Sequence, residues 1–340
     1  MTDSTQTSAL MKEGRFVRFL SSSAGRATIA FVLVMLLGLI FNADGAFFKL
    51  GMHRDALRQA SVFGILAVGM TVVIITGGID LSVGSILAVS AVLFSILTLH
   101  LDWPAWISIL SCIIVGAGLG AISGTLIAVT KLQPFIATLA MMTFGRGVAK
   151  YITGGQKIST YLTNSDGEVI IKELPRIFKV IDSRIMGGNI AIVSIIFLFC
   201  LLITWLFLAK HKWGRELFSI GGNEESARLS GVPVKWTKFL AYTVSGIMCA
   251  IAGIAQAAQE TQGDPEAGGG YELTAIAMVV IGGTNMAGGR GGMGLTLIGI
   301  LTIGYLEKIL SINAVPESGR LLITGVIIVL AVLTQRKNRN

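Results

Sequence analysis

The stretch FSIGGNEESARLSGV, residues 218–232, lies between two long, mainly apolar segments at residues 189–209 and 237–259. As a helix, each run of about 20 residues is long enough to cross the ~30 Å hydrocarbon core of a bilayer. The stretch between them is polar. It therefore predicts a short helix outside the membrane that connects two membrane spans.

Residues 223–231 carry the signals that begin and end such a helix. Asn223 can accept hydrogen bonds from the free N–H groups of the first turn, and Glu224 and Glu225 place negative charge beside them. Arg228 lies toward the last carbonyls, and Gly231 supplies a left-handed stop. Because Lys and Arg accumulate in short cytoplasmic loops, we expect this loop on the cytoplasmic side. The basic residues around it are Lys210, Lys212, Arg215, Lys235 and Lys238.

The composition extends this prediction to the whole chain. Of 340 residues, 53% are apolar and only 14% are charged, and the mean hydropathy is +0.76, so most of the chain should lie in lipid. The 42 glycines against 6 prolines agree, because helices in lipid use small residues for close packing. We expect an all-α, polytopic membrane protein.

The apolar runs give a topology. About ten could cross the membrane, and an even number puts both termini on one face, which the Lys and Arg bias places in the cytoplasm. We expect a cytoplasmic segment at residues 1–24, one transmembrane domain at residues 25–335 and a cytoplasmic tail at residues 336–340. Residues 210–236 would form the main cytoplasmic loop, and residues 156–188 a small external cap. The runs are 25–42, 57–76, 80–99, 104–130, 135–154, 189–209, 237–259, 271–286, 294–311 and 319–335.

Charge and cysteine usage exclude several other classes. The net charge of +8 does not indicate nucleic-acid binding, because the basic residues stand at the ends of apolar runs and form no continuous tract. Cys112, Cys200 and Cys249 each fall inside an apolar run without a Cys-x-x-Cys or Cys/His pattern. We expect free buried thiols, and neither a disulfide nor a metal site.

Glycine spacing predicts one helix-packing face. Gly116, Gly120 and Gly124 recur every four residues in the fourth run, so they share one side of a helix and let a second helix approach closely. The pattern leaves open whether that second helix belongs to the same subunit.

A weak internal repeat relates residues 70–80 to residues 277–285. In both, an apolar run breaks at a glycine pair that a short polar side chain follows. Transporters often build their pathway from duplicated halves with interrupted helices. Chance similarity between two apolar runs is the alternative.

Two charged residues fall within the predicted spans. Asp80 can cap a helix that begins at Leu81, and it could also line or gate a polar pathway, because a carboxylate at membrane depth is costly. Arg146 lies about eleven residues into the helix that begins at Pro134, near mid-membrane, so its guanidinium needs a partner or water. It would either lock two helices together or line the pathway. The partners that the sequence offers are Asp80, Glu272 and the carbonyls freed at Gly77 and Gly78.

The cytoplasmic stretch resembles the coupling-helix signature in the membrane subunits of bacterial ABC importers for ribose, galactose and xylose. The motifs that carry the resemblance, in order, are VGMT running into GGIDLSVG (68–84), QPFIATL (133–139), RGV (146–148), IGGNEESARLSGV (220–232), YEL (271–273) and GGT through AGG (282–289). They cover about residues 55–335. The resemblance implies a permease in the bacterial inner membrane that receives a monosaccharide from a periplasmic binding protein and works as a homodimer.

The resemblance also implies site residues and partners. Two ATPase subunits, or one ATPase with two cassettes, would bind ATP and dock on the cytoplasmic loop, so this chain itself would bind no cofactor and would contact membrane lipid around it. The residues expected to couple to the ATPase are Gly221, Gly222, Asn223, Glu224, Glu225, Ala227, Arg228, Leu229 and Gly231. The candidates for a pathway or gate are Asp80, Ser82, Phe135, Thr138, Arg146, Glu272, Thr284 and Asn285.

No motif indicates an enzyme. Residues 288–292 are glycine-rich, but no Lys in the chain is followed by Ser or Thr, so a Walker A phosphate loop is absent. A self-sufficient secondary transporter of a small polar solute is one alternative, although Asp80 and Glu272 are few acids for ion coupling. A membrane-embedded transferase is another, and it would need a cluster of Asp or His at the lipid boundary, which the sequence lacks.

Overall fold

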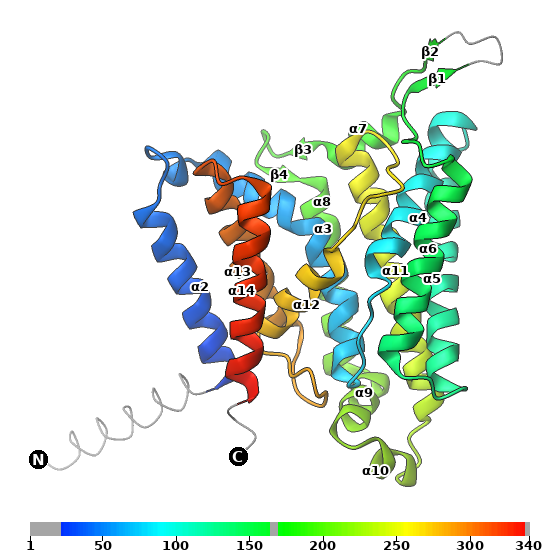
Figure 1. Cartoon of the computed structure of the whole chain (residues 1–340), viewed down its shortest axis with the longest axis vertical. Coiled ribbons are helices and arrows are strands. Elements are labelled where there is room, and N and C mark those ends of the chain that lie inside the picture. Colours follow the sequence, from blue (N-terminus) through cyan, green and yellow to red (C-terminus); the bar gives the residue numbers. More distant parts are fainter. Residues whose placement is uncertain (1–21, 164–168, 337–340) are drawn as a thin grey trace, which may run out of the picture.

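The computed structural model describes residues 22–163 and 169–336. Most of its helices run side by side between two faces (Figure 1). One face carries the strands and α7 and is called the hairpin face below; the opposite one carries α9 and α10 and is called the α10 face. The helices are α2 (Ser23–Ile40), α3 (Leu50–Ile75), α4 (Val83–Ser95), α5 (Ala105–Ala128), α6 (Pro134–Thr153), α7 (Arg176–Asp182), α8 (Ile192–Lys210), α9 (Lys212–Gly222), α10 (Glu224–Leu229), α11 (Val234–Glu260), α12 (Tyr271–Ile281), α13 (Met293–Ile312) and α14 (Glu317–Arg336), with a 3-10 turn η1 (Ala46–Phe48) and a π turn η2 (Ile96–His100).

Four short strands form two hairpins on one face. β1 (Tyr161–Thr163) pairs antiparallel with β2 (Val169–Ile171), and β3 (Arg184–Ile185) pairs antiparallel with β4 (Ile190–Ala191). Together with α7 they make up the described part of the cap predicted at residues 156–188. Residues 164–168 of that cap lie outside the described residues.

The all-α, polytopic class is confirmed, but a count of ten spans is not. Among the described residues, seven helices are long and apolar enough to cross a membrane: α2, α3, α4 continued by η2, α5, α8, α11 and α13. The three remaining predicted runs form α6, α12 and α14, which are not among these seven. α6 carries Arg146 and Lys150, and α12 has only 11 residues, because its run ends at Gly282.

The helix α3 lies at the centre of the fold. Residues 64–75 of this helix are buried without exception, and apolar side chains occur on all its sides. A helix that is apolar all round belongs in an interior. It packs against α8, α11, α12 and α13.

The predicted glycine face packs α5 against α11 of the same chain. A Cβ atom on Gly116 would lie 2.6 Å from the carbonyl oxygen of Gly246, and one on Gly120 would lie 2.3 Å from that of Tyr242. Real Cβ atoms do not approach backbone so closely, so the two helices touch through their main chains. The sequence therefore predicted this face correctly, and the structure supplies the partner.

The ends of α3 and α12 support the internal repeat. The N–H of Gly78 donates to the carbonyl of Val73 (3.3 Å), and the N–H of Thr284 donates to that of Val279 (3.2 Å). In each case the residue before the donor is a glycine with positive φ, 79° and 104°. This is the Schellman cap. The two caps align Gly77 with Gly283. Aligning the glycine pairs themselves would instead match Gly77 with Gly282, so the two alignments differ by one residue.

The prediction that residues 218–232 form one short helix is wrong, because this stretch holds the end of α9 and the whole of α10. Besides α10, the helices α7 and α9 are also short and lie at the two faces (Figure 1). The helix α9 buries Gly214, Leu217 and Ile220, which are three residues apart and so share one side. Gly221 and Gly222 consequently end a helix of their own and do not stand in an irregular entry to α10.

Candidate functional site

Two helices begin inside the helical layer and not at its surface (Figure 1). The chain rises from the end of α3 through residues 76–82 before α4 starts, and it descends from the end of α11 through residues 261–270 before α12 starts. The two starts meet, because a Cβ atom on Gly84 would lie 2.0 Å from the carbonyl oxygen of Gly268. Helix starts have free N–H groups with partial positive charge, so their meeting point can bind polar groups.

Asp80 holds the rising segment in place. Its side chain is 1% exposed, and Oδ1 accepts hydrogen bonds from the Ser82 N–H (3.0 Å) and the Ser82 hydroxyl (2.5 Å). Oδ2 accepts from the hydroxyl of Ser245 on α11 (2.7 Å). The predicted cap is thus displaced: α4 begins at Val83, and Asp80 stabilises the turn before it. Three donors satisfy a carboxylate that would otherwise be costly to bury.

The same segment is fixed by a second contact point. The carbonyl oxygen of Ile79 accepts hydrogen bonds from the Tyr242 hydroxyl and from the Thr138 hydroxyl, each at 3.4 Å. Tyr242 and Ser245 lie three residues apart on α11 and therefore face the same way. Neither Tyr242 nor Ser245 was predicted as a site residue, since a lone hydroxyl within an apolar run carries no signal of its own.

Arg146 ties α6 to the descending segment. Its Nη1 donates to the carbonyl oxygens of Pro265 (2.5 Å) and Ala267 (2.8 Å). The predicted partners are therefore wrong in position: Asp80 is occupied by serine donors, and the accepting carbonyls belong to neither Gly77 nor Gly78. Glu272 lies near enough to act on the guanidinium through its charge. The geometry is that of a lock between α6 and the start of α12.

Two lysines pin the same segment from its outer side. Lys150 on α6 pairs with Glu266 (2.5 Å), and Lys157 pairs with Asp264 (2.9 Å). The Asp264 carboxylate raises the pKa of the Lys157 ammonium, so Lys157 stays charged throughout the neutral range. With Arg146, three cations hold residues 264–267 against α6 and the residues that follow it.

The structure brings together only part of the predicted pathway set. Asp80 and Ser82 lie in the rising segment, and Thr138 on α6 hydrogen-bonds to it. Arg146 and Glu272 lie beside the start of α12. Three residues lie elsewhere. Phe135 is 53% exposed on the outer side of α6, and Thr284 and Asn285 follow the far end of α12, where the Asn285 side chain accepts from the Ala287 N–H (3.0 Å).

The helix α10 has the ends that its sequence predicts. The Asn223 side chain accepts from the Ser226 N–H (2.9 Å), and Gly231 has φ +83° after the last turn. Arg228 is a correction: its side chain turns back onto Glu225 through two hydrogen bonds (2.9 and 2.5 Å) and does not reach the last carbonyls. The Arg228 guanidinium lowers the pKa of the Glu225 carboxyl, so the pair is fully charged at neutral pH.

The surface of α10 is free except at one position. Ala227 is buried at 2%, whereas Glu224, Glu225, Arg228 and Leu229 are exposed, Leu229 at 74%. These side chains are therefore accessible to a second protein.

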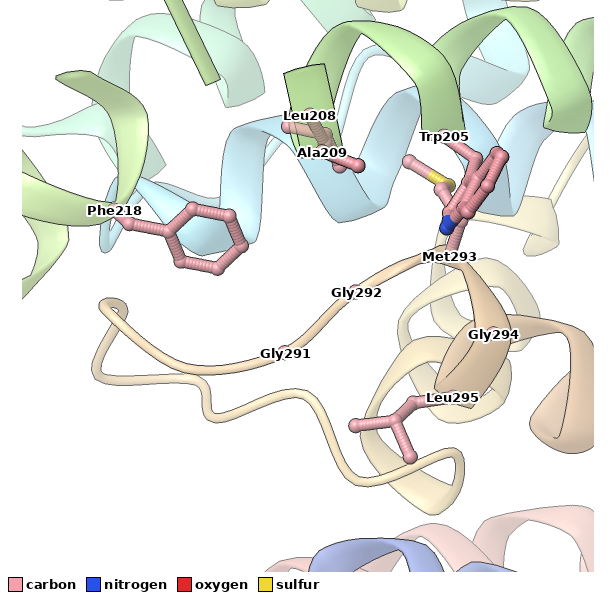
Figure 2. A pocket seen from close by; sticks show the side chains of 9 residues that line it. All are labelled: Trp205, Leu208, Ala209, Phe218, Gly291, Gly292, Met293, Gly294 and Leu295. Atoms are coloured by element: carbon pink, nitrogen blue, oxygen red, sulfur yellow. The ribbon is translucent and has the colours of Figure 1, made fainter. Parts of the chain in front are cut away.

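A groove lies on the same face between α8, α9 and the residues before α13 (Figure 2). Its volume is about 370 Å³, and Figure 2 shows Trp205, Phe218 and Met293 around it together with the backbone of residues 291–294. The lining is almost entirely apolar. The groove is therefore suited to a hydrocarbon chain and not to a polar solute.

Helices that break inside a membrane layer, around hydrogen-bonded polar residues, define a membrane transport protein. Comparison with known proteins agrees. Residues 53–332 match the family described as branched-chain amino acid transport system / permease component. The ribose import permease of Escherichia coli is 37% identical over 308 residues, covering 90% of this chain and 92% of that protein.

Relatives named for other sugars are similar over the same extent. The fructose import permease of Bifidobacterium longum is 33% identical, covering 91% of this chain and 89% of its own, and the xylose transport system permease of Escherichia coli is 32% identical, covering 89% of each. The chain therefore belongs to this family of ABC-importer permeases. It is a multi-pass inner-membrane transport protein and not an enzyme.

Proposed function

We propose that this chain is the membrane subunit of an ATP-driven importer and that its cargo is a monosaccharide. The observation that carries the proposal is the similarity, over about nine tenths of the chain, to permeases named for ribose, fructose and xylose. The family description names branched-chain amino acids, whose ammonium and carboxylate groups would need charged partners. Asp80 and Arg146 are already bonded within the chain, which favours an uncharged, hydroxyl-rich solute.

The proposed topology has ten spans with both ends in the cytoplasm. Three helices would join the seven long apolar ones: α6, α14 and the half-length α12. In Figure 1 the start of α2 and the end of α14 lie at the α10 face. The basic residues that flank the helices at this face would then lie in the cytoplasm. They include Arg26, Lys131, Lys210, Lys212, Arg215, Lys235, Lys238 and Arg290.

The α10 face would receive the ATPase. The exposed positions of α10 and its neighbours fit a docking surface for two ATPase subunits or one ATPase with two cassettes. ATP would be bound there, and this chain would hold no cofactor. At the opposite face, the β1–β2 hairpin, α7 and the outer part of residues 260–270 would receive the periplasmic binding protein.

A second copy of the chain would pack against α6. Three residues on the outward side of this helix, Thr143, Gly147 and Lys150, are exposed at the level of the membrane. Polar groups facing lipid are costly, so this side is better suited to a partner and a polar pathway. The homodimer would then place the solute path near its axis, beside the meeting point of α4 and α12.

Transport in proteoliposomes tests the proposal. The chain is reconstituted with the ATPase and binding protein of the same importer, and uptake of labelled ribose, xylose, fructose and leucine is measured with and without ATP. We expect uptake of one of the sugars only with ATP and all components, and no ATP hydrolysis by the chain alone. Sugar uptake driven by an ion gradient without the ATPase would establish a secondary transporter, and ATP-dependent leucine uptake would establish an amino-acid permease.

A further inference from the structure

Three stretches of backbone meet beside α10 with no side chain between them. They are the end of α9 at Gly221, the end of α3 at Ile75, and the turn at residues 288–289 that follows α12. We call this meeting point the glycine junction. It lies at the α10 face, where α9 lies beside the end of α3 (Figure 1).

The contacts in the junction are close enough to admit only glycine. A Cβ atom on Gly221 would lie 1.9 Å from the carbonyl oxygen of Ile75 and 2.3 Å from the nitrogen of Gly289. A Cβ atom on Gly288 would lie 2.7 Å from the nitrogen of Gly77 and 2.9 Å from the Cα atom of Gly221. The Gly289 N–H donates to the Ile75 carbonyl (2.9 Å), so the turn is also hydrogen-bonded to the end of α3.

Each stretch leads directly to a different part of the molecule. Two residues after Gly221, Asn223 begins α10, the proposed docking helix. Five residues after Ile75, Asp80 holds the segment that rises to α4. The turn at residues 288–289 joins the end of α12 to the start of α13. The junction is therefore the place where the end of α9, which leads directly into the docking helix, touches the end of α3 and the turn that follows α12.

Backbone contacts of this kind transmit displacement well. A flexible side chain at an interface can change rotamer and absorb a shift, whereas main-chain atoms in contact must move together or separate. The helix α9 is also packed firmly against the rest of the chain, because Leu217 and Ile220 on its inner side are buried.

We propose that the glycine junction is the positioning element that passes movement of α10 to the ends of α3 and α12, and thereby to the meeting point of α4 and α12. The proposal rests on the proposed function, in which an ATPase docks on α10. Gly221 contacts no solute in this scheme. It acts only by setting the position of the two breaks.

A matched pair of substitutions tests the proposal in the reconstituted complex. Gly221→Ala forces the junction apart, whereas Gly118→Ala, on α5 and away from the junction, places its methyl group where no atom lies within 4 Å. We expect both variants to retain the ATPase subunit and its ATP hydrolysis. Sugar uptake should fall about tenfold with Gly221→Ala, within the range by which such networks alter coupling, and stay at the wild-type rate with Gly118→Ala. Equal uptake by the two variants would overturn the proposal.

Hydrogen exchange of the wild-type complex decides the matter even if Gly221→Ala does not fold. Exchange is compared without nucleotide and with ATP trapped by vanadate. We expect peptides covering residues 74–80 and 285–290 to change protection together with the peptide covering residues 219–229. A change confined to residues 219–229 would refute the junction and leave the docking role intact. No change at residues 219–229, or failure of the ATPase to co-purify, would instead refute the docking role.

Discussion

Charged side chains inside the helical layer are satisfied by groups of this chain that the sequence does not reveal. The sequence showed that Asp80 and Arg146 need partners, because an unpaired charge at membrane depth is costly. It did not show which partners. Arg146 binds backbone carbonyls about 120 residues away in sequence, and a carbonyl is present at every residue, so no residue type marks it. The serine on α11 that binds Asp80 is equally unmarked.

The lock that Arg146 forms between α6 and the segment before α12 can be tested by replacing this residue with methionine. Arg146→Met keeps an apolar stem but leaves the carbonyls of Pro265 and Ala267 without their donor. Because the side chain is partly exposed, we expect a loss of about 1–3 kcal/mol of stability, seen as a lower Tm in detergent. Lys150→Met is the control, since its pair with Glu266 is largely exposed and should contribute at most ~1 kcal/mol. An unchanged Tm with altered transport would make Arg146 a pathway residue.

For helices, packing faces that repeat along the sequence could be predicted, whereas the points at which helices are interrupted could be predicted only in part. The four-residue glycine spacing of α5 predicted a packing face because helix geometry alone places those residues together. The run at residues 271–286 looked like one span, yet its glycine pair ends α12 after 11 residues. The helix α9 was missed because its buried side consists of only three residues, one of them glycine.

The packing of α5 on α11 gives a prediction with a control in the same helix. Gly120→Ala would place a methyl group 2.3 Å from the Tyr242 carbonyl oxygen, so the helices must separate. Overpacking of this kind typically costs about 1–3 kcal/mol. Gly118→Ala meets nothing within 4 Å and should leave Tm unchanged or slightly higher, because Ala favours helix. Equal Tm values for the two variants would contradict the close approach of the helices.

The helix α10 gives a prediction about coupling. Glu225→Lys replaces the hydrogen-bonded pair with Arg228 by a repulsion and puts positive charge at the helix start, where it is unfavourable. Because Glu225 is exposed, we expect normal membrane insertion and Tm. Sugar uptake by the assembled complex should fall about tenfold or more if the docking surface is disrupted. Glu317→Lys makes the same charge change in the first turn of α14, at the hairpin face and outside the proposed docking surfaces, and is the control; loss of uptake there alone would argue against docking on α10.

For the whole molecule, the lengths of the apolar runs and the arrangement of helices agree. Apolar run lengths predicted the helical class and most span boundaries, since the bilayer thickness sets them. Three-dimensional features such as the meeting of α4 and α12 were beyond prediction, because they depend on loops whose residues carry no length or periodicity signal. Both ends of the described chain nonetheless lie at the face where the sequence places the basic loops (Figure 1).

Single cysteines test this orientation in intact cells. The three native cysteines are buried and free, so they give little background labelling. Glu173→Cys lies exposed at the hairpin face and Lys235→Cys lies exposed at the α10 face. A maleimide that does not cross the inner membrane should label Glu173→Cys in cells whose outer membrane is opened, and should label Lys235→Cys only after the inner membrane is broken, because positive loops stay in the cytoplasm. The reverse pattern would invert the topology, and with it the assignment of the ATPase to the α10 face.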